Sequence, residues 1–148
     1  MPRLHAKKTS VREDGVFKNT HALNLIVGDR KETPCDHETF EKFKLWVAGS
    51  LAQKSIETYR RDDVVIEHWD DQSGDRYPHL LNPCECGTYL PMEIEPTPMF
   101  SSAIGLLSDL NELKTNAGAI PAEFDAIIDT MMRMAEFSLA TNTALEIK

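Results

Sequence analysis

Residues 101–113 read SSAIGLLSDLNEL, and they carry the clearest helical pattern of the chain. Ser101 or Ser102 can cap the helix, because a serine oxygen accepts a hydrogen bond from the first turn. The run Asn116-Ala117-Gly118 is typical of a helix end. Steps of three and four residues place the apolar side chains on one face. That face comprises Ala103, Leu106, Leu107, Leu110 and Leu113.

A second amphipathic helix is expected after Pro121, since proline suits the first turn of a helix. The methionines Met131 and Met134 fall on its apolar stripe, so we interpret them as core residues rather than as an adaptable binding surface. The full stripe comprises Phe124, Ile127, Ile128, Met131, Met134, Ala135 and Leu139.

A third long helix is expected to begin after Asp36, whose carboxylate suits the N-cap position. Arg60 and Arg61 place cations where a helix C-terminus favours them, so the helix is predicted to continue to Arg61. A bend is expected at Gly49-Ser50. The helical spacing rests on Phe40, Phe43, Val47 and Leu51, with Ile56 and Tyr59 further along.

Short apolar runs predict a small sheet. Residues 23–27 end at the turn signal Gly28-Asp29, and residues 64–66 are β-branched. Residues 145–147 are expected to close the chain as an edge strand. Residues 76–99 contain five prolines, too many for a helix, and are interpreted as an irregular loop segment with extended pieces at 89–90 and 92–94.

The predicted architecture is therefore α+β, mostly helical, with about three main helices and a small sheet. A length of 148 residues with 41% hydrophobic residues fits one domain, expected over residues 15–148 after a flexible arm at residues 1–14. No apolar run approaches the roughly 18 residues that cross a membrane. Three cysteines argue against a fully paired disulfide framework, which favours a cytoplasmic location.

Charge is divided unevenly along the chain, whose formal net charge is −8. Residues 1–61 hold 12 Lys/Arg and 8 Asp/Glu, whereas residues 62–148 hold 4 and 16. An acidic surface of this kind repels nucleic acid and attracts a basic protein partner. The alternative interpretation is that the charge serves solubility alone.

Two cysteine-containing pairs are candidate zinc ligands. Cys35 and His37 lie just before the long helix that is predicted to end at Arg61, and Cys84 and Cys86 lie in the proline-rich segment. Both pairs are expected in loops, and Gly87 would leave room for the chain to curl around an ion. Four Cys and His ligands suit a closed structural zinc site, although zinc pairs usually have two to four intervening residues. The alternatives are three reduced thiols with a surface histidine, or a redox-active Cys84–Cys86 disulfide.

Residues 68–79 are a second candidate for chemistry. His68, Asp70, Asp71 and His79 supply the residue types of acid–base catalysis, which makes a small hydrolase one alternative. The twelve-residue calcium loop is excluded, because the twelfth position holds Leu81 or Asn82 instead of glutamate. The other interpretation is a hydrated turn with two surface histidines.

The string Pro78-His79-Leu80-Leu81-Asn82, then Cys84 and Gly87-Thr88-Tyr89-Leu90-Pro91, resembles one found in small uncharacterised bacterial proteins. A serine-capped leucine helix follows it in both. The resemblance implies a shared fold without an activity, and Cys86 departs from the pattern. We expect a non-enzymatic binding or accessory domain, with zinc as a structural staple. One alternative is an acidic inhibitor of a basic protein, similar to the immunity proteins that neutralise toxins.

Overall fold

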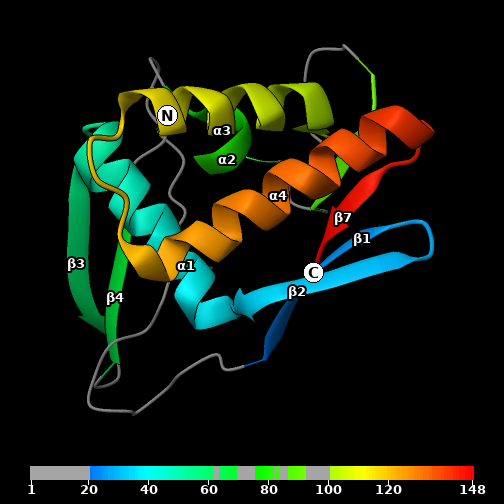
Figure 1. The fold of residues 1–148 in the computed structure, drawn as a ribbon. Coiled ribbons are helices and arrows are strands. Elements are labelled where there is room, and N and C mark those ends of the chain that lie inside the picture. The colour runs from blue at the N-terminus through cyan, green and yellow to red at the C-terminus, as the bar shows by residue number, and fades with distance from the viewer. Residues whose placement is uncertain (1–20, 62–63, 70–75, 82, 84–86, 93–100) are drawn as a thin grey trace. The chain divides into compact units, whose positions relative to one another are not determined.

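The computed structural model describes residues 21–61, 64–69, 76–81, 83, 87–92 and 101–148 (Figure 1). The chain divides into two compact units. The first unit comprises Met1–Ala22 and Asp36–Arg76, and the second comprises Leu23–Cys35 and Tyr77–Lys148. The predicted arm at residues 1–14 lies outside the described residues. The expectation of one domain over residues 15–148 stays a prediction.

A five-stranded sheet forms one layer of the second unit, in the order β2-β1-β7-β5-β6. β7 pairs antiparallel with β1 and with β5, whereas β5 and β6 run parallel. The prediction of β7 as an edge strand is wrong. β7 lies at the centre, because Leu145 is fully buried and both backbone edges of the strand are paired. The strands are β1 (Ala22–Val27), β2 (Arg30–Asp36), β5 (Thr88–Leu90), β6 (Ser101–Ser102) and β7 (Leu145–Ile147).

The hairpin of β1 and β2 turns at Gly28-Asp29, as the sequence predicts. Gly28 has a φ of +59°, a left-handed conformation that glycine adopts without steric cost. β1 alternates buried and less buried residues, which fits one face on the core. β2 was missed, because its residues are polar and include Pro34. An edge strand tolerates such a proline, since edge N–H groups need no ladder partner.

Both predicted helices of the second unit are confirmed. α3 (Ala103–Asn116) begins at Ser102, whose oxygen accepts a hydrogen bond from Gly105 N at 3.1 Å. α4 (Ala122–Thr141) begins after Pro121, contacts α3 and is followed by the left-handed C-cap residue Asn142. The buried core of this unit includes Leu23, Leu25, Val27, Tyr77, Leu80, Leu81, Tyr89, Leu106, Leu110, Leu113, Phe124, Ile127, Ile128, Met131, Met134 and Leu145.

The described part of the proline-rich segment contains a helical turn, α2 (Pro78–Leu81), where the sequence predicts no helix. Proline fits here because it occupies the first position of the turn, where no backbone N–H is needed. Leu80 and Leu81 are each 1% exposed, so burial fixes this short turn. The extended conformation expected at residues 89–90 is confirmed as part of β5.

In the first unit, α1 (His37–Trp46) continues into a π-helical turn, η2 (Val47–Leu51). Asp36 caps α1 by accepting a hydrogen bond from Thr39 N at 2.7 Å, as predicted. The expected bend at Gly49-Ser50 coincides with η2, where the helix widens.

The predicted continuation of this helix to Arg61 is wrong. The chain leaves the helix at Gln53, which has a φ of +58°. Ile56–Arg61 forms β3, which pairs antiparallel with β4 (Val64–Trp69). Ile56, Thr58 and Tyr59 are residue types that favour a strand, and pairing with β4, which contains the β-branched run Val64–Ile66, gives β3 its partner. β4 extends the strand predicted at residues 64–66. The fold class is α+β, as predicted.

Candidate functional site

The exposed side of α4 carries a row of carboxylates. Asp125, Asp129 and Glu136 lie within one narrow arc of the helix, given a turn of 3.6 residues, and all three are exposed. Asp129 has Lys114 of α3 at 3.9 Å, with both side chains about half exposed or more. Asp125 and Glu136 make no ion pair with any residue that the structure describes. We call these three residues the acidic face of α4.

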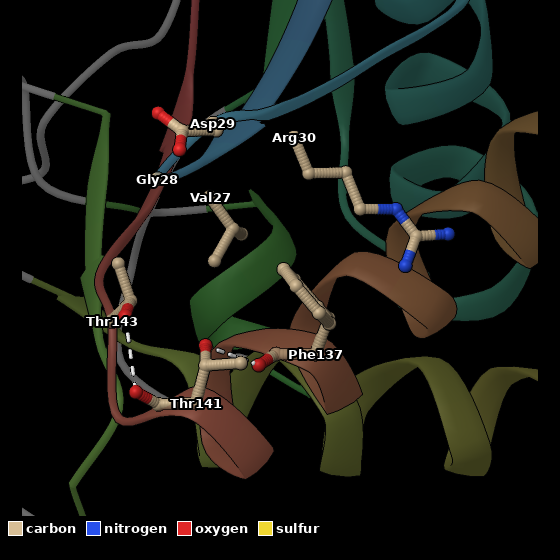
Figure 2. Close-up of a pocket in the computed structure, with 7 residues that line it drawn as sticks. All are labelled: Val27, Gly28, Asp29, Arg30, Phe137, Thr141 and Thr143. Carbon is tan, nitrogen blue, oxygen red and sulfur yellow. Dashed lines mark hydrogen bonds between the residues drawn. The ribbon is translucent and has the colours of Figure 1, made fainter.

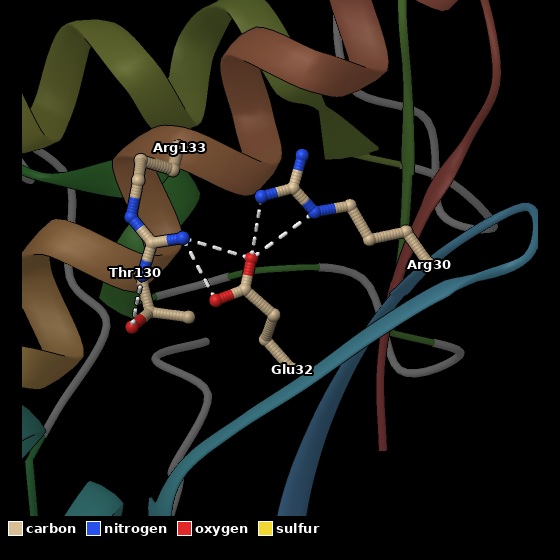
Figure 3. A network of polar contacts seen from close by, with 4 residues as sticks. All are labelled: Arg30, Glu32, Thr130 and Arg133. Atoms are coloured by element: carbon tan, nitrogen blue, oxygen red, sulfur yellow. Dashed lines mark hydrogen bonds and ion pairs between the residues drawn. The ribbon is translucent and has the colours of Figure 1, made fainter.

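Arg133 is the single cation of α4, and its charge is matched by a partner on the sheet (Figure 3). Its Nη1 lies 2.8 Å from both carboxylate oxygens of Glu32 in β2, and its Nη2 donates to Thr130 Oγ1 at 3.3 Å. The hydrogen bond from Arg133 holds the pKa of Glu32 below its usual value. Arg133 therefore cancels little of the negative charge of the acidic face.

Arg30 completes this polar network from the other side. Its Nε and Nη2 lie 3.2 and 3.0 Å from Glu32 Oε2, so two arginines share one carboxylate (Figure 3). The guanidinium carbon of Arg30 also lies 4.9 Å from the centre of the Phe137 ring, a cation–π distance. The network joins the edge strand β2 to the middle of α4.

A hollow of about 390 Å³ opens between the β1–β2 turn and the C-terminal end of α4 (Figure 2). The hydroxyls at its lower rim are oriented by the backbone: Thr141 donates to Phe137 O at 2.7 Å, and Thr143 donates to Thr141 O at 3.1 Å. Asp29 is exposed at the rim and has no ion-pair partner within the described part of the chain. The lining residues are Val27, Gly28, Asp29, Arg30, Phe137, Thr141 and Thr143.

A buried carboxylate anchors α2. Asp109 of α3 is 6% exposed and accepts hydrogen bonds from His79 N at 2.7 Å and Leu80 N at 3.1 Å. Burial raises the pKa of Asp109 to about 7, because desolvation disfavours its charged form more than the two N–H donors favour it. Tyr89 of β5 adds a hydrogen bond to His79 O at 3.1 Å. Asp109 thus holds a chain segment in place.

The His79 imidazole packs directly on Gly105 of α3, where a β-carbon would overlap the ring. The predicted hydrolase residues are not all placed: His68 lies in β4 of the first unit, and His79 lies in the second. Asp70 and Asp71 lie outside the described residues. The hydrolase alternative stays a prediction, while the contacts of His79 give it a structural role.

The structure describes only two of the four predicted zinc ligands. Cys35 is partly exposed near the end of β2 and His37 is the first residue of α1, so their expected loop positions are wrong. Cys84 and Cys86 lie outside the described residues. In the sheet, two strands, β1 and β7, lie between β2, which contains Cys35, and β5, which directly follows Gly87. Within the described ranges, no three His, Cys, Asp or Glu side chains are grouped to hold a metal. The four-ligand site stays a prediction.

The backbone conformation and the contacts of Gly87 explain why this residue is glycine. Its φ is +72°, and a β-carbon there would lie 2.6 Å from Ile147 O of β7. Ile147 N also donates to Gly87 O at 2.9 Å. Close pairing with β7 therefore accounts for this glycine.

Comparison with known proteins gives no relative: no protein family, curated protein or solved structure matches this chain. None of the described helices is long and apolar enough to cross a membrane. The site must therefore be judged on its own chemistry. Sequence reasoning missed both the hollow and the arginine–glutamate network, because each joins β2 to α4 across about a hundred residues of chain. The one local signal was the charged run that follows Gly28.

Proposed function

We propose that this protein is a non-enzymatic binding domain that recognises a basic protein partner through the acidic face of α4. The observation that supports the proposal is a row of exposed carboxylates, Asp125, Asp129 and Glu136, whose neighbouring arginine is committed to Glu32. Complementary charge of this kind steers a cationic partner and fixes its orientation.

The charge of the second unit as a whole supports the same proposal. This unit holds 5 Lys/Arg and 12 Asp/Glu, so it carries most of the net charge of the chain. The first unit is nearly balanced, with 11 Lys/Arg and 12 Asp/Glu. A basic partner is therefore attracted chiefly to the second unit. An inhibitor that neutralises a basic protein is one form this binding could take.

The polar residues inside the second unit also fit a binding domain better than a hydrolase. Asp109 is engaged by two backbone N–H groups, and the His79 ring is packed against Gly105. Both residues stabilise α2 through these contacts. The surface charge, in contrast, has no structural partner at Asp125 and Glu136 among the residues described.

The test compares capture of a partner by three forms of the full chain. The first is the wild type, and the second is the triple variant Asp125→Asn/Asp129→Asn/Glu136→Gln. The third is a matched control, Glu112→Gln/Glu123→Gln/Glu146→Gln, which removes the same charge from residues of the second unit that are not part of the acidic face. A cationic protein from the source cells should be captured by the wild type and the control but not by the triple variant.

Affinity of the purified partner should also fall with added salt, since the screening length drops from about 10 Å at 0.1 M to about 3 Å at 1 M. Equal binding by all three forms would contradict the proposal. Binding that does not change with salt would contradict it as well.

A further inference from the structure

The hollow between the β1–β2 turn and α4 presents hydrogen-bond acceptors along one side (Figure 2). The hydroxyl protons of Thr141 and Thr143 are given to backbone carbonyls, so their oxygens are left to accept. The Asp29 carboxylate adds a negative charge at the rim and has no ion-pair partner among the described residues. This side of the hollow suits a ligand that donates hydrogen bonds.

The helix end adds to the negative potential. α4 ends at Thr141, and its last turn contains no basic residue. The carbonyl end of a helix of this length carries about half a negative charge. A cation in the hollow would therefore meet the helix end, two hydroxyl oxygens and a carboxylate.

Arg30 is the one cation among the described residues that line the hollow, and the network holds it away from Asp29. Its side chain points to the opposite side of the hollow from the Asp29 carboxylate (Figure 2). Glu32 binds its guanidinium, and Arg133 fixes Glu32 in turn (Figure 3). The network thus explains why Asp29 has no salt bridge to the arginine that follows it in the sequence.

We propose that the hollow receives a lysine side chain from the basic partner. The aliphatic stem would pack against the partly exposed Phe137, and the ammonium would bind Asp29 and the two threonine oxygens. A volume of about 390 Å³ is ample for one such side chain. That the lysine comes from the basic partner rests on the proposed function. In the complex, the acidic face would attract and orient the partner, and the lysine in the hollow would anchor it.

The hollow can be tested without the partner by NMR on the full chain. The probes are three blocked tripeptides, acetyl-Gly-Lys-Gly-amide and its norleucine and glutamate counterparts. The lysine peptide should shift the amide signals of Gly28, Asp29, Asn142 and Thr143, with a Kd on the order of 1–10 mM. The norleucine and glutamate peptides should leave these signals unchanged.

Variants assign the binding to the proposed contacts. Asp29→Asn should weaken the lysine peptide roughly fivefold, the effect of one exposed ion pair. Arg30→Gln should strengthen it, because a like charge leaves the wall. The matched control Glu123→Gln removes one exposed carboxylate from the first turn of α4, outside both the hollow and the acidic face, and should leave the affinity unchanged.

Three results would overturn the inference. The first is that the lysine peptide causes no shifts in the hollow, and the second is that the norleucine peptide causes the same shifts. The third is that the glutamate peptide binds and loses its affinity in Arg30→Gln, which would identify an anion site. The acidic-face triple variant separates this inference from the proposed function. It should lose the partner but keep the lysine peptide, so that either claim can fail alone.

Discussion

At the scale of single residues, glycine and aspartate on α3 determine how α2 is held. Gly105 admits the His79 ring, and Asp109 binds the backbone N–H groups of His79 and Leu80. From the sequence, Gly105 looks like a weak point in a helix, and Asp109 looks like a surface residue beside the apolar stripe. Neither role is visible in the local pattern, because both depend on a segment about thirty residues away.

Gly105→Ala should destabilise the protein by about 1–3 kcal/mol, because a β-carbon would overlap the His79 ring. Alanine normally stabilises a helix interior over glycine by up to about 1 kcal/mol, so the expected sign is reversed here. Gly118→Ala is the matched control, since nothing lies within 4 Å of its added carbon. Urea unfolding measures each variant.

The double variant Gly105→Ala/His79→Ala should be as stable as His79→Ala alone, or more stable. A loss of stability that persists in this background would show that the ring contact is not the cause.

Asp109→Asn should remove a pH dependence of stability. The pKa of Asp109 in the folded protein, about 7, is above its ordinary value of 3.8, so the folded state binds the proton more tightly. Its contribution to stability is therefore fully present below about pH 4 and is lost as the pH rises through about 7. The variant should gain stability over the wild type at pH 8 and little at pH 4.

Urea unfolding at both pH values provides the comparison. An equal difference at pH 4 and pH 8 would mean that Asp109 ionises with an ordinary pKa.

At the scale of elements, the sequence predicts correctly those segments whose apolar residues repeat with one helical or strand period. The prediction fails where pairing with a distant strand overrides the local pattern. The stripes of α3 and α4 and the caps Asp36 and Ser102 are visible in the sequence, because each depends on neighbours within one turn. β3 was predicted as helix, since Ile56 and Tyr59 continue a helical spacing until the partner strand β4 is known. β2 has no apolar pattern at all.

α1 contains a buried ion pair that the periodicity also missed. Lys44 Nζ lies 2.9 Å from Glu41 Oε1, and their side chains are 11% and 10% exposed. Lys44→Met alone should destabilise the protein by roughly 3 kcal/mol, because it leaves a buried carboxylate without its cation. The double variant Lys44→Met/Glu41→Leu should recover most of that loss.

Thermal or urea unfolding of the two single variants and the double variant gives the coupling between the residues. Additive effects would show that the pair is not coupled.

At the scale of the whole molecule, composition gives a formal net charge of −8, and the structure adds where part of that charge lies. Most of the excess of acidic residues lies in the second unit, and α4 exposes part of it. The zinc prediction also belongs to this scale, since it joins residues far apart in the chain. Its two pairs could be recognised from the sequence, but their convergence depends on how the chain folds.

If Cys35, His37, Cys84 and Cys86 bind zinc, the purified protein should hold about one ion per chain, and Cys84→Ser should lower both zinc content and stability. Elemental analysis measures the zinc content, and thiol titration measures how readily the three cysteines react. Zinc-free protein with all three thiols reacting readily would rule the staple out.

The central claim is that the acidic face of α4 binds a basic protein. Its most direct test is the salt dependence of the Kd for the captured partner, measured with the wild type and with Asp125→Asn/Asp129→Asn/Glu136→Gln. We predict that affinity falls steeply with salt for the wild type and that the variant is both weaker and much less sensitive to salt. Identical salt dependence for the two proteins would contradict the account.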